Sequence, residues 1–242
     1  MPNPTAAMLV IGDEILSGRT RDANMYHLAN QLTARGIDLK EVRVVSDDAP
    51  AIVAAVKALS AGFDHVFTSG GIGPTHDDIT ADCIAEAFDT PIGIRDDARA
   101  LLAAHYERTG RELNAPRLRM ARIPDGAALI ENPVSVAPGF TIGNVHVMAG
   151  VPSVFEAMVA SVLPGLTGGA PLISESLRVD KGEGDIAETL TSISATYNDL
   201  SIGCYPFQEN GRYGANVVLR GSDPARVTAA RTALVRALEA LA

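Results

Sequence analysis

The residues best suited to chemistry lie in one stretch, 69–80, which reads Ser-Gly-Gly-Ile-Gly-Pro-Thr-His-Asp-Asp-Ile-Thr. It follows an apolar run and precedes a helix-like pattern at 81–88. Glycines at a strand-to-helix turn let the backbone approach a ligand, with several N–H groups pointing outward. The helix that follows adds the positive end of its dipole. These features predict a loop that binds a phosphate or another oxyanion.

Two adjacent carboxylates, Asp77 and Asp78, stand just after the glycines. They would repel a bound phosphate unless a divalent cation lay between them, and Mg²⁺ or Mn²⁺ prefers such oxygen ligands. We therefore expect Asp77 and Asp78 to hold a metal ion. A second interpretation stays open, because Asp and Thr also cap helices and a glycine-proline cluster also forms ordinary tight turns.

Three more polar turns follow apolar runs, at residues 12–14, at Asp47 and Asp48, and at residues 150–153. Open α/β sheets bind ligands beyond the carboxyl ends of their strands. We therefore expect these turns and the glycine loop to meet at one edge of a sheet.

Short strand-like and helix-like patterns alternate in the first part of the chain. Strands are expected at 8–11, 42–45 and 65–68, and helices at 23–32, 52–59 and 81–88, with further strands at 128–130, 139–142 and 145–148. This alternation predicts a three-layer α/β fold: a mostly parallel sheet with helices on both faces. After a Gly/Pro-rich linker, a βαββα pattern predicts a small α+β domain. The expected domains are 1–167 and 168–242.

Composition narrows the class of protein. The 242 residues are 47% hydrophobic and 20% charged, as in ordinary soluble globular proteins. A formal net charge of −9 argues against a nucleic-acid binder. The nearest basic cluster, residues 117–122, fits a solvated helix face or a local anion contact. No apolar run is long enough to cross a membrane, and Cys83 and Cys204 are isolated, so we expect a cytoplasmic protein with no membrane partner.

Two common hydrolase classes find no support. The five histidines form no metal-binding pair at helical spacing, and no Gly-x-Ser-x-Gly elbow is present. His76 lies inside the loop, where it would either contact phosphate or stay solvated.

The motifs at 12–14, 22–24, 69–80, 137–140 and 150–153, in this order, resemble the molybdopterin-binding (MoaB/Mog-like) domain. They look most like the version at the N-terminus of competence/damage-inducible protein A (CinA). The likeness covers about the first 165 residues, and the remainder is similar to the small middle domain of CinA. CinA proteins usually continue into a deamidase domain; this sequence stops at Ala242, so the resemblance does not extend to that activity.

The resemblance implies one of three chemistries: adenylylation of molybdopterin, molybdenum insertion, or metal-dependent cleavage of ADP-ribose or FAD with Mg²⁺, Co²⁺ or Mn²⁺. It places Asp78 closest to metal and phosphate and Asp47 at the second acidic position, and we expect both to be catalytic. A dimer or trimer is also implied. The residues expected to bind the ligand are Gly12, Asp13, Glu14, Asn24, Ser69, Gly70, Gly71, Gly73, Pro74, Thr75, Thr80, Pro152 and Ser153.

Several positions depart from the family pattern. His76 stands where Lys is common, Ser135-Val136 replaces a usual Gly-Thr, and Val154 replaces a usual Glu. Two functions remain in view: a pyrophosphatase acting on a pterin or nucleotide pyrophosphate, and a non-catalytic module that binds molybdopterin or a nucleotide.

Overall fold

The strands in the first part of the chain differ in sequence pattern from those in the last part. Strand β1 (Thr5–Ile11) is apolar on both faces, and its last six residues are buried. Strand β9 (Ile173–Val179) instead alternates between half-buried and exposed residues until its last position. The computed structural model, which describes residues 2–209 and 211–241, has two units: an N-terminal unit, Met1–Gly169, and a C-terminal unit, Ala170–Ala242.

The N-terminal unit is built on a six-stranded sheet. Its strand order is β2 (Asp38–Val45), β1, β3 (His65–Ser69), β8 (Val145–Met148), β7 (Gly139–Ile142) and β6 (Ala128–Ile130). The first four of these strands are parallel, whereas β7 and β6 add antiparallel pairings. The sheet is therefore mostly parallel, as predicted.

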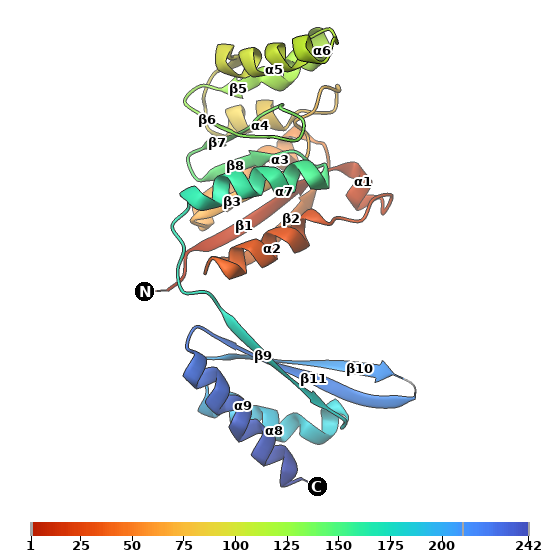
Figure 1. Cartoon of the computed structure of the whole chain (residues 1–242), viewed down its shortest axis with the longest axis vertical. Helices are drawn as coiled ribbons and strands as arrows, with labels where there is room; N and C mark the ends of the chain where they lie inside the picture. Colours follow the sequence, from red (N-terminus) through yellow and green to blue (C-terminus); the bar gives the residue numbers. More distant parts are fainter. Residues whose placement is uncertain (1, 210, 242) are drawn as a thin grey trace. The chain divides into compact units, whose positions relative to one another are not determined.

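Helices cover both faces of this sheet (Figure 1). One face packs on α2 (Asn24–Ala34) and α7 (Pro152–Val162), and the other on α3 (Ala49–Gly62) and α4 (Thr80–Ala87). Alternate residues of β1 supply the two cores: Met8 and Val10 on one side, Leu9 and Ile11 on the other. The predicted three-layer architecture is confirmed.

Several short helices and strands were not predicted from the sequence. Residues expected to form a plain turn begin α1 (Asp13–Leu16), and β4 (Ile92–Ile94) pairs with β5 (Arg122–Pro124) in a two-stranded sheet. Each has three or four residues, too few to show a period. The helical pattern after residue 96 is divided into α5 (Asp96–Arg108), α6 (Ala115–Leu118) and the 3₁₀ turn η1 (Arg119–Ala121), and a second 3₁₀ turn, η2 (Leu163–Gly165), follows α7.

The C-terminal unit has the predicted βαββα order. Its elements are β9, α8 (Glu183–Thr196), β10 (Ser201–Glu209), β11 (Arg212–Gly221) and α9 (Pro224–Glu239), and the antiparallel strand order is β10-β11-β9. Inward residues of β11, such as Val217 and Leu219, pack on Ile186 of α8 and Leu234 of α9. Among the described residues of both units, no helix is long and apolar enough to cross a membrane.

Candidate functional site

The polar turns that follow β1, β2, β3 and β8 line one cavity of about 720 Å³. They contribute Gly12 and Glu14, Asp47, the glycine loop with Asp77 and Asp78, and residues 150–154. Parallel strands place their carboxyl ends at the same edge, which is why turns from distant parts of the chain meet here. The turns expected at one edge of the sheet are thus brought together.

The glycine loop is tied to the start of α4. The buried Thr80 hydroxyl donates to the Gly70 carbonyl (3.0 Å), and the Thr80 N–H donates to the Gly71 carbonyl (2.9 Å). Gly71 has φ 68°, and a Cβ there would lie 2.1 Å from the Thr80 hydroxyl. Only glycine therefore fits at this position. Thr80, expected to bind the ligand, is turned toward the loop and does not line the cavity.

The Asp78 carboxylate is held in place from within the loop. Its Oδ2 accepts hydrogen bonds from the Thr75 N–H (2.8 Å) and the Thr75 hydroxyl (2.6 Å). A Cβ at Gly73 would lie 2.6 Å from the same oxygen, so glycine leaves room for the carboxylate. Thr75 orients Asp78, and neither Thr75 nor Pro74 is among the residues that line the cavity.

A buried amide joins two of the turns. Asn24 Nδ2 donates to Ser69 Oγ at the end of β3 and to the Gly150 carbonyl after β8, both at 2.8 Å. Asn24 and Ser69 are 3% and 2% exposed. Their hydrogen bonds hold the glycine loop beside the Gly150 turn, and direct contact of either side chain with a ligand stays a prediction.

Asp47 lies in an acidic environment. Its Oδ2 accepts a hydrogen bond from the Asp13 N–H (3.0 Å), at the start of α1. Burial raises the pKa of Asp47, the Asp13 amide opposes this, and the nearby charges of Asp13, Glu14 and Asp77 raise the pKa further. Asp13 itself does not line the cavity. A cation placed here would relieve the repulsion between these carboxylates.

The fit to a metal ion is partial. Within residues 2–209 and 211–241, no group of three or more His, Cys, Asp or Glu side chains is placed to hold one. Mg²⁺ usually takes one or two carboxylates and completes its shell with water and phosphate oxygens. The carboxylates of Glu14, Asp47, Asp77 and Asp78, which share one cavity, suit such a donor set. Metal binding by Asp77 and Asp78 stays a prediction.

One wall of the cavity, formed by Asn132, Val134, Ser135 and Ala137, was not among the expected ligand residues, although Ser135 and Ala137 belong to the compared family motifs. Asn132 Nδ2 donates to Ser135 Oγ (2.6 Å) and to the Ala137 carbonyl (2.8 Å), and its Oδ1 accepts from the N–H groups of Val134 and Ser135. This wall also contains Val136, which has φ 68°. The Asn-Pro dipeptide at 132–133 is a turn signal that could have indicated a loop here, but not its role.

Comparison with known proteins decides the family. Residues 7–168 match the model of the probable molybdopterin binding domain. The chain belongs to this family. Residues 171–242 match a second model, the FAD synthase middle domain, in the part of the chain that the sequence likened to the small middle domain of CinA.

Individual relatives agree with this assignment. The crystal structure of CinA from Thermoplasma acidophilum is 34% identical, with a TM-score of 0.62 over 68% of this chain and 99% of that one. A probable FAD synthase of Caenorhabditis elegans is 31% identical over 95% of this chain and 49% of its own length. A CinA-like protein of Citrifermentans bemidjiense is 40% identical over 67% of this chain and 40% of its own length. The chain thus spans half or less of these two relatives.

Proposed function

We propose that this chain binds a pterin or nucleotide pyrophosphate in the cavity and, with a divalent cation, hydrolyses its phosphoanhydride bond, as in ADP-ribose or FAD. One observation carries the proposal: the glycine loop and four carboxylates line the same cavity. Its volume of about 720 Å³ is within the usual range for small-molecule sites. The names of relatives, an FAD synthase and a molybdopterin-binding family, support a ligand of this size and charge.

Each group in the cavity has a part in this reaction. Backbone N–H groups of the glycine loop would hold phosphoryl oxygens and stabilise the negative charge that develops on them. A bound Mg²⁺, Co²⁺ or Mn²⁺ would polarise the phosphoryl group and lower the pKa of water. The Oδ2 atom of Asp78 accepts hydrogen bonds from Thr75. Its Oδ1 atom has no hydrogen-bond partner among the described residues and is available to a cation.

Asp47 would accept the proton of the attacking water. Its raised pKa makes it a better proton acceptor than an ordinary Asp. The water oxygen bonds to phosphorus, the anhydride P–O bond breaks, and its electron pair leaves with the departing phosphate. The products are two phosphate monoesters.

The replacement Asp78→Asn tests this proposal. It keeps an oxygen that can accept from Thr75, so we expect the unfolding temperature to be unchanged. Turnover of ADP-ribose and FAD, assayed with each metal, should fall at least about 100-fold because the anionic cation ligand is lost.

Asp180→Asn, at an exposed position of the C-terminal unit, is the matched control and should leave turnover unchanged. Unchanged metal-dependent turnover in the Asp78→Asn protein would overturn the assignment of Asp78.

A non-catalytic binding module is the second candidate. This candidate is favoured because no group of three or more potential metal ligands is found among the described residues. A module that only binds molybdopterin or a nucleotide does not need the carboxylates to hold a metal ion. In that case the wild-type protein would bind ADP-ribose or FAD, no metal would yield a product, and Asp78→Asn would change affinity only slightly. Family resemblance also leads us to expect a homodimer or homotrimer, which light scattering can measure.

A further inference from the structure

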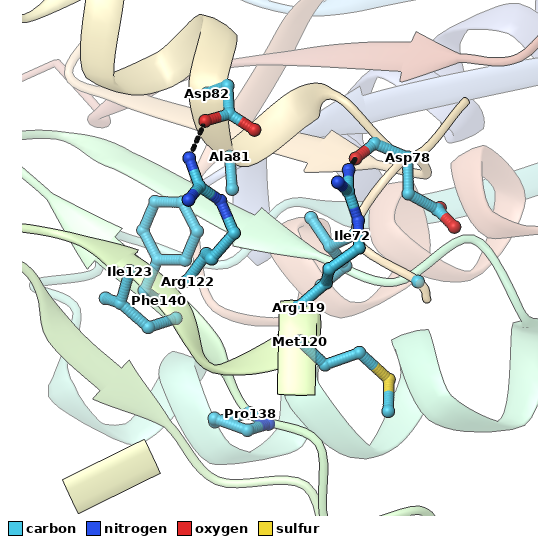
Figure 2. Close-up of a pocket in the computed structure, with 11 residues that line it drawn as sticks. Ile72, Asp78, Ala81, Asp82, Arg119, Met120, Arg122, Ile123, Pro138 and Phe140 are labelled. Carbon is cyan, nitrogen blue, oxygen red and sulfur yellow. Dashed lines mark hydrogen bonds and ion pairs between the residues drawn. The ribbon is translucent and has the colours of Figure 1, made fainter. Parts of the chain in front are cut away.

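A small pocket adjoins the main cavity and brings two arginines to the glycine loop. It shares Ile72, Gly73, Asp78 and Met120 with the main cavity, and adds Arg119 and Arg122. Figure 2 shows both guanidinium groups rising from the segment around η1 toward the end of the glycine loop and the start of α4. The basic cluster at 117–122 therefore lies next to the candidate site.

The two arginines differ in how their charge is compensated. Arg122 forms an ion pair with Asp82 of α4. Arg119 Nη2 donates only a long hydrogen bond, 3.4 Å, to the backbone carbonyl of Asp78 and forms no ion pair with any described carboxylate. The Asp78 carboxylate points away from this guanidinium (Figure 2). Arg119 thus has no carboxylate partner among the described residues, and most of its N–H donors are free.

The negative charge of the main cavity favours a cationic side chain near a bound phosphate. Four carboxylates line it, and the lining residues include no Lys, Arg or His. A pyrophosphate brings further negative charge, and one divalent cation neutralises only part of the total. A guanidinium in the adjoining pocket supplies a monovalent cation whose planar fork matches phosphate oxygens.

We propose that Arg119 binds a phosphoryl oxygen of the ligand held at the glycine loop. This inference rests on the proposed binding of a pyrophosphate ligand, and it assigns a residue that contacts the ligand directly. Arg122 has no such role, because Asp82 already neutralises it.

Calorimetric titration of the full chain with ADP in Mg²⁺ tests the assignment. We expect Arg119→Gln to weaken binding about 10- to 100-fold, the loss typical of a charge-assisted hydrogen bond. The matched control, Arg122→Gln, should stay within about 3-fold of wild type, and Arg119→Lys should fall between the two.

The dependence of ADP affinity on salt separates a direct contact from a structural role. Salt screens an attraction between charges, so affinity should fall less with added salt in Arg119→Gln than in wild type. Wild-type affinity and salt dependence in Arg119→Gln, or an equal loss in Arg122→Gln, would overturn the proposal.

The results also separate this proposal from the hydrolase proposal. A wild-type protein that binds ADP but yields no product refutes hydrolysis and leaves the role of Arg119 in place if Arg119→Gln binds weakly. Turnover with normal binding in Arg119→Gln refutes only the role of Arg119. A wild-type protein that does not bind ADP at all overturns the Arg119 assignment too.

Discussion

The N-terminal unit buries its central strands on both faces, whereas the C-terminal unit leaves one face of its strands exposed and polar. The parallel strands β1, β3 and β8 are buried almost throughout. In the antiparallel β9, the exposed Ser174, Ser176 and Arg178 alternate with more buried residues, because helices cover only one face of its sheet. A sheet covered on both faces leaves mainly the ends of its strands open to solvent and ligands. Chemistry in this protein is therefore expected in the turns of the N-terminal unit.

The largest expected difference between the two units is in the free energy of unfolding when one glycine in each is replaced by alanine. Gly71 and Gly211 both have positive φ, 68° and 76°, but only at Gly71 would a Cβ meet another group. Gly71→Ala should cost about 3 kcal/mol, from backbone strain plus the clash with Thr80, and should abolish ligand binding. Gly211→Ala should cost about 1 kcal/mol and leave binding unchanged. Denaturant unfolding and ADP titration measure both effects.

Acid should weaken the N-terminal unit before the C-terminal unit, since the two histidines with lowered pKa values, His65 and His146, lie in the former. Burial lowers the pKa of His146 to about 4, and burial also lowers the pKa of its neighbour His65. The unfolded chain thus binds protons that the folded unit does not. The stabilisation is complete above pH 6.5 and is lost toward pH 4, by about 2 kcal/mol between pH 6.5 and pH 5.

Hydrogen exchange followed by mass spectrometry can assign this loss to strands. Protection of β8 should fall over that pH range while protection of β11 stays constant. His146→Gln should remove most of the pH dependence, whatever its effect on total stability. A parallel loss of protection in both units would contradict the prediction.

Two polar substitutions of similar thermodynamic cost should separate stability from function. Asn24→Ala removes the link between Ser69 and Gly150 and should cost about 1–2 kcal/mol. Asp223→Ala removes the N-cap of α9 and should cost about 1 kcal/mol. Only Asn24→Ala should raise the KM or Kd for the ligand, because only that change removes hydrogen bonds that hold a turn lining the cavity. Equal affinities in the two variants would argue against the bracing role of Asn24.

The smallest expected difference between variants lies in the stabilisation that the metal ion gives. With ADP present, Mg²⁺ at about ten times its Kd should stabilise the N-terminal unit by about 1.4 kcal/mol. Asp47→Asn should reduce this gain, since it removes one carboxylate from the acidic cavity. Exposed Asp180→Asn in the C-terminal unit should not. A gain unaffected by Asp47→Asn would exclude that carboxylate from metal binding.

The fold was predictable because its strands and helices have clear periods. Apolar runs such as β1 and capped helices such as α3, whose Asp48 accepts from Ala51, are local signals in the sequence. Short elements such as β4 have no such signal, since their pairing with β5 depends on residues 30 positions away.

The candidate site was predictable only in part. Glycines and carboxylates at strand ends indicated the cavity, because topology brings strand ends together. The sequence could not show that Thr75, Thr80 and Asn24 form hydrogen bonds within the protein. The same residue types are used to bind a ligand and to stabilise a loop. The Asn132 wall lies about 60 residues after the glycine loop, and only the folded chain brings both to one cavity.

One residue of that wall affects how the cavity can change shape. Val136 is β-branched and holds a left-handed conformation, φ 68°, which costs such a residue about 1–2 kcal/mol. The four hydrogen bonds of Asn132 offset that cost. The wall is therefore maintained against the chain's own torsional preference, and loss of the Asn132 hydrogen bonds would remove the contacts that keep Val136 in this conformation.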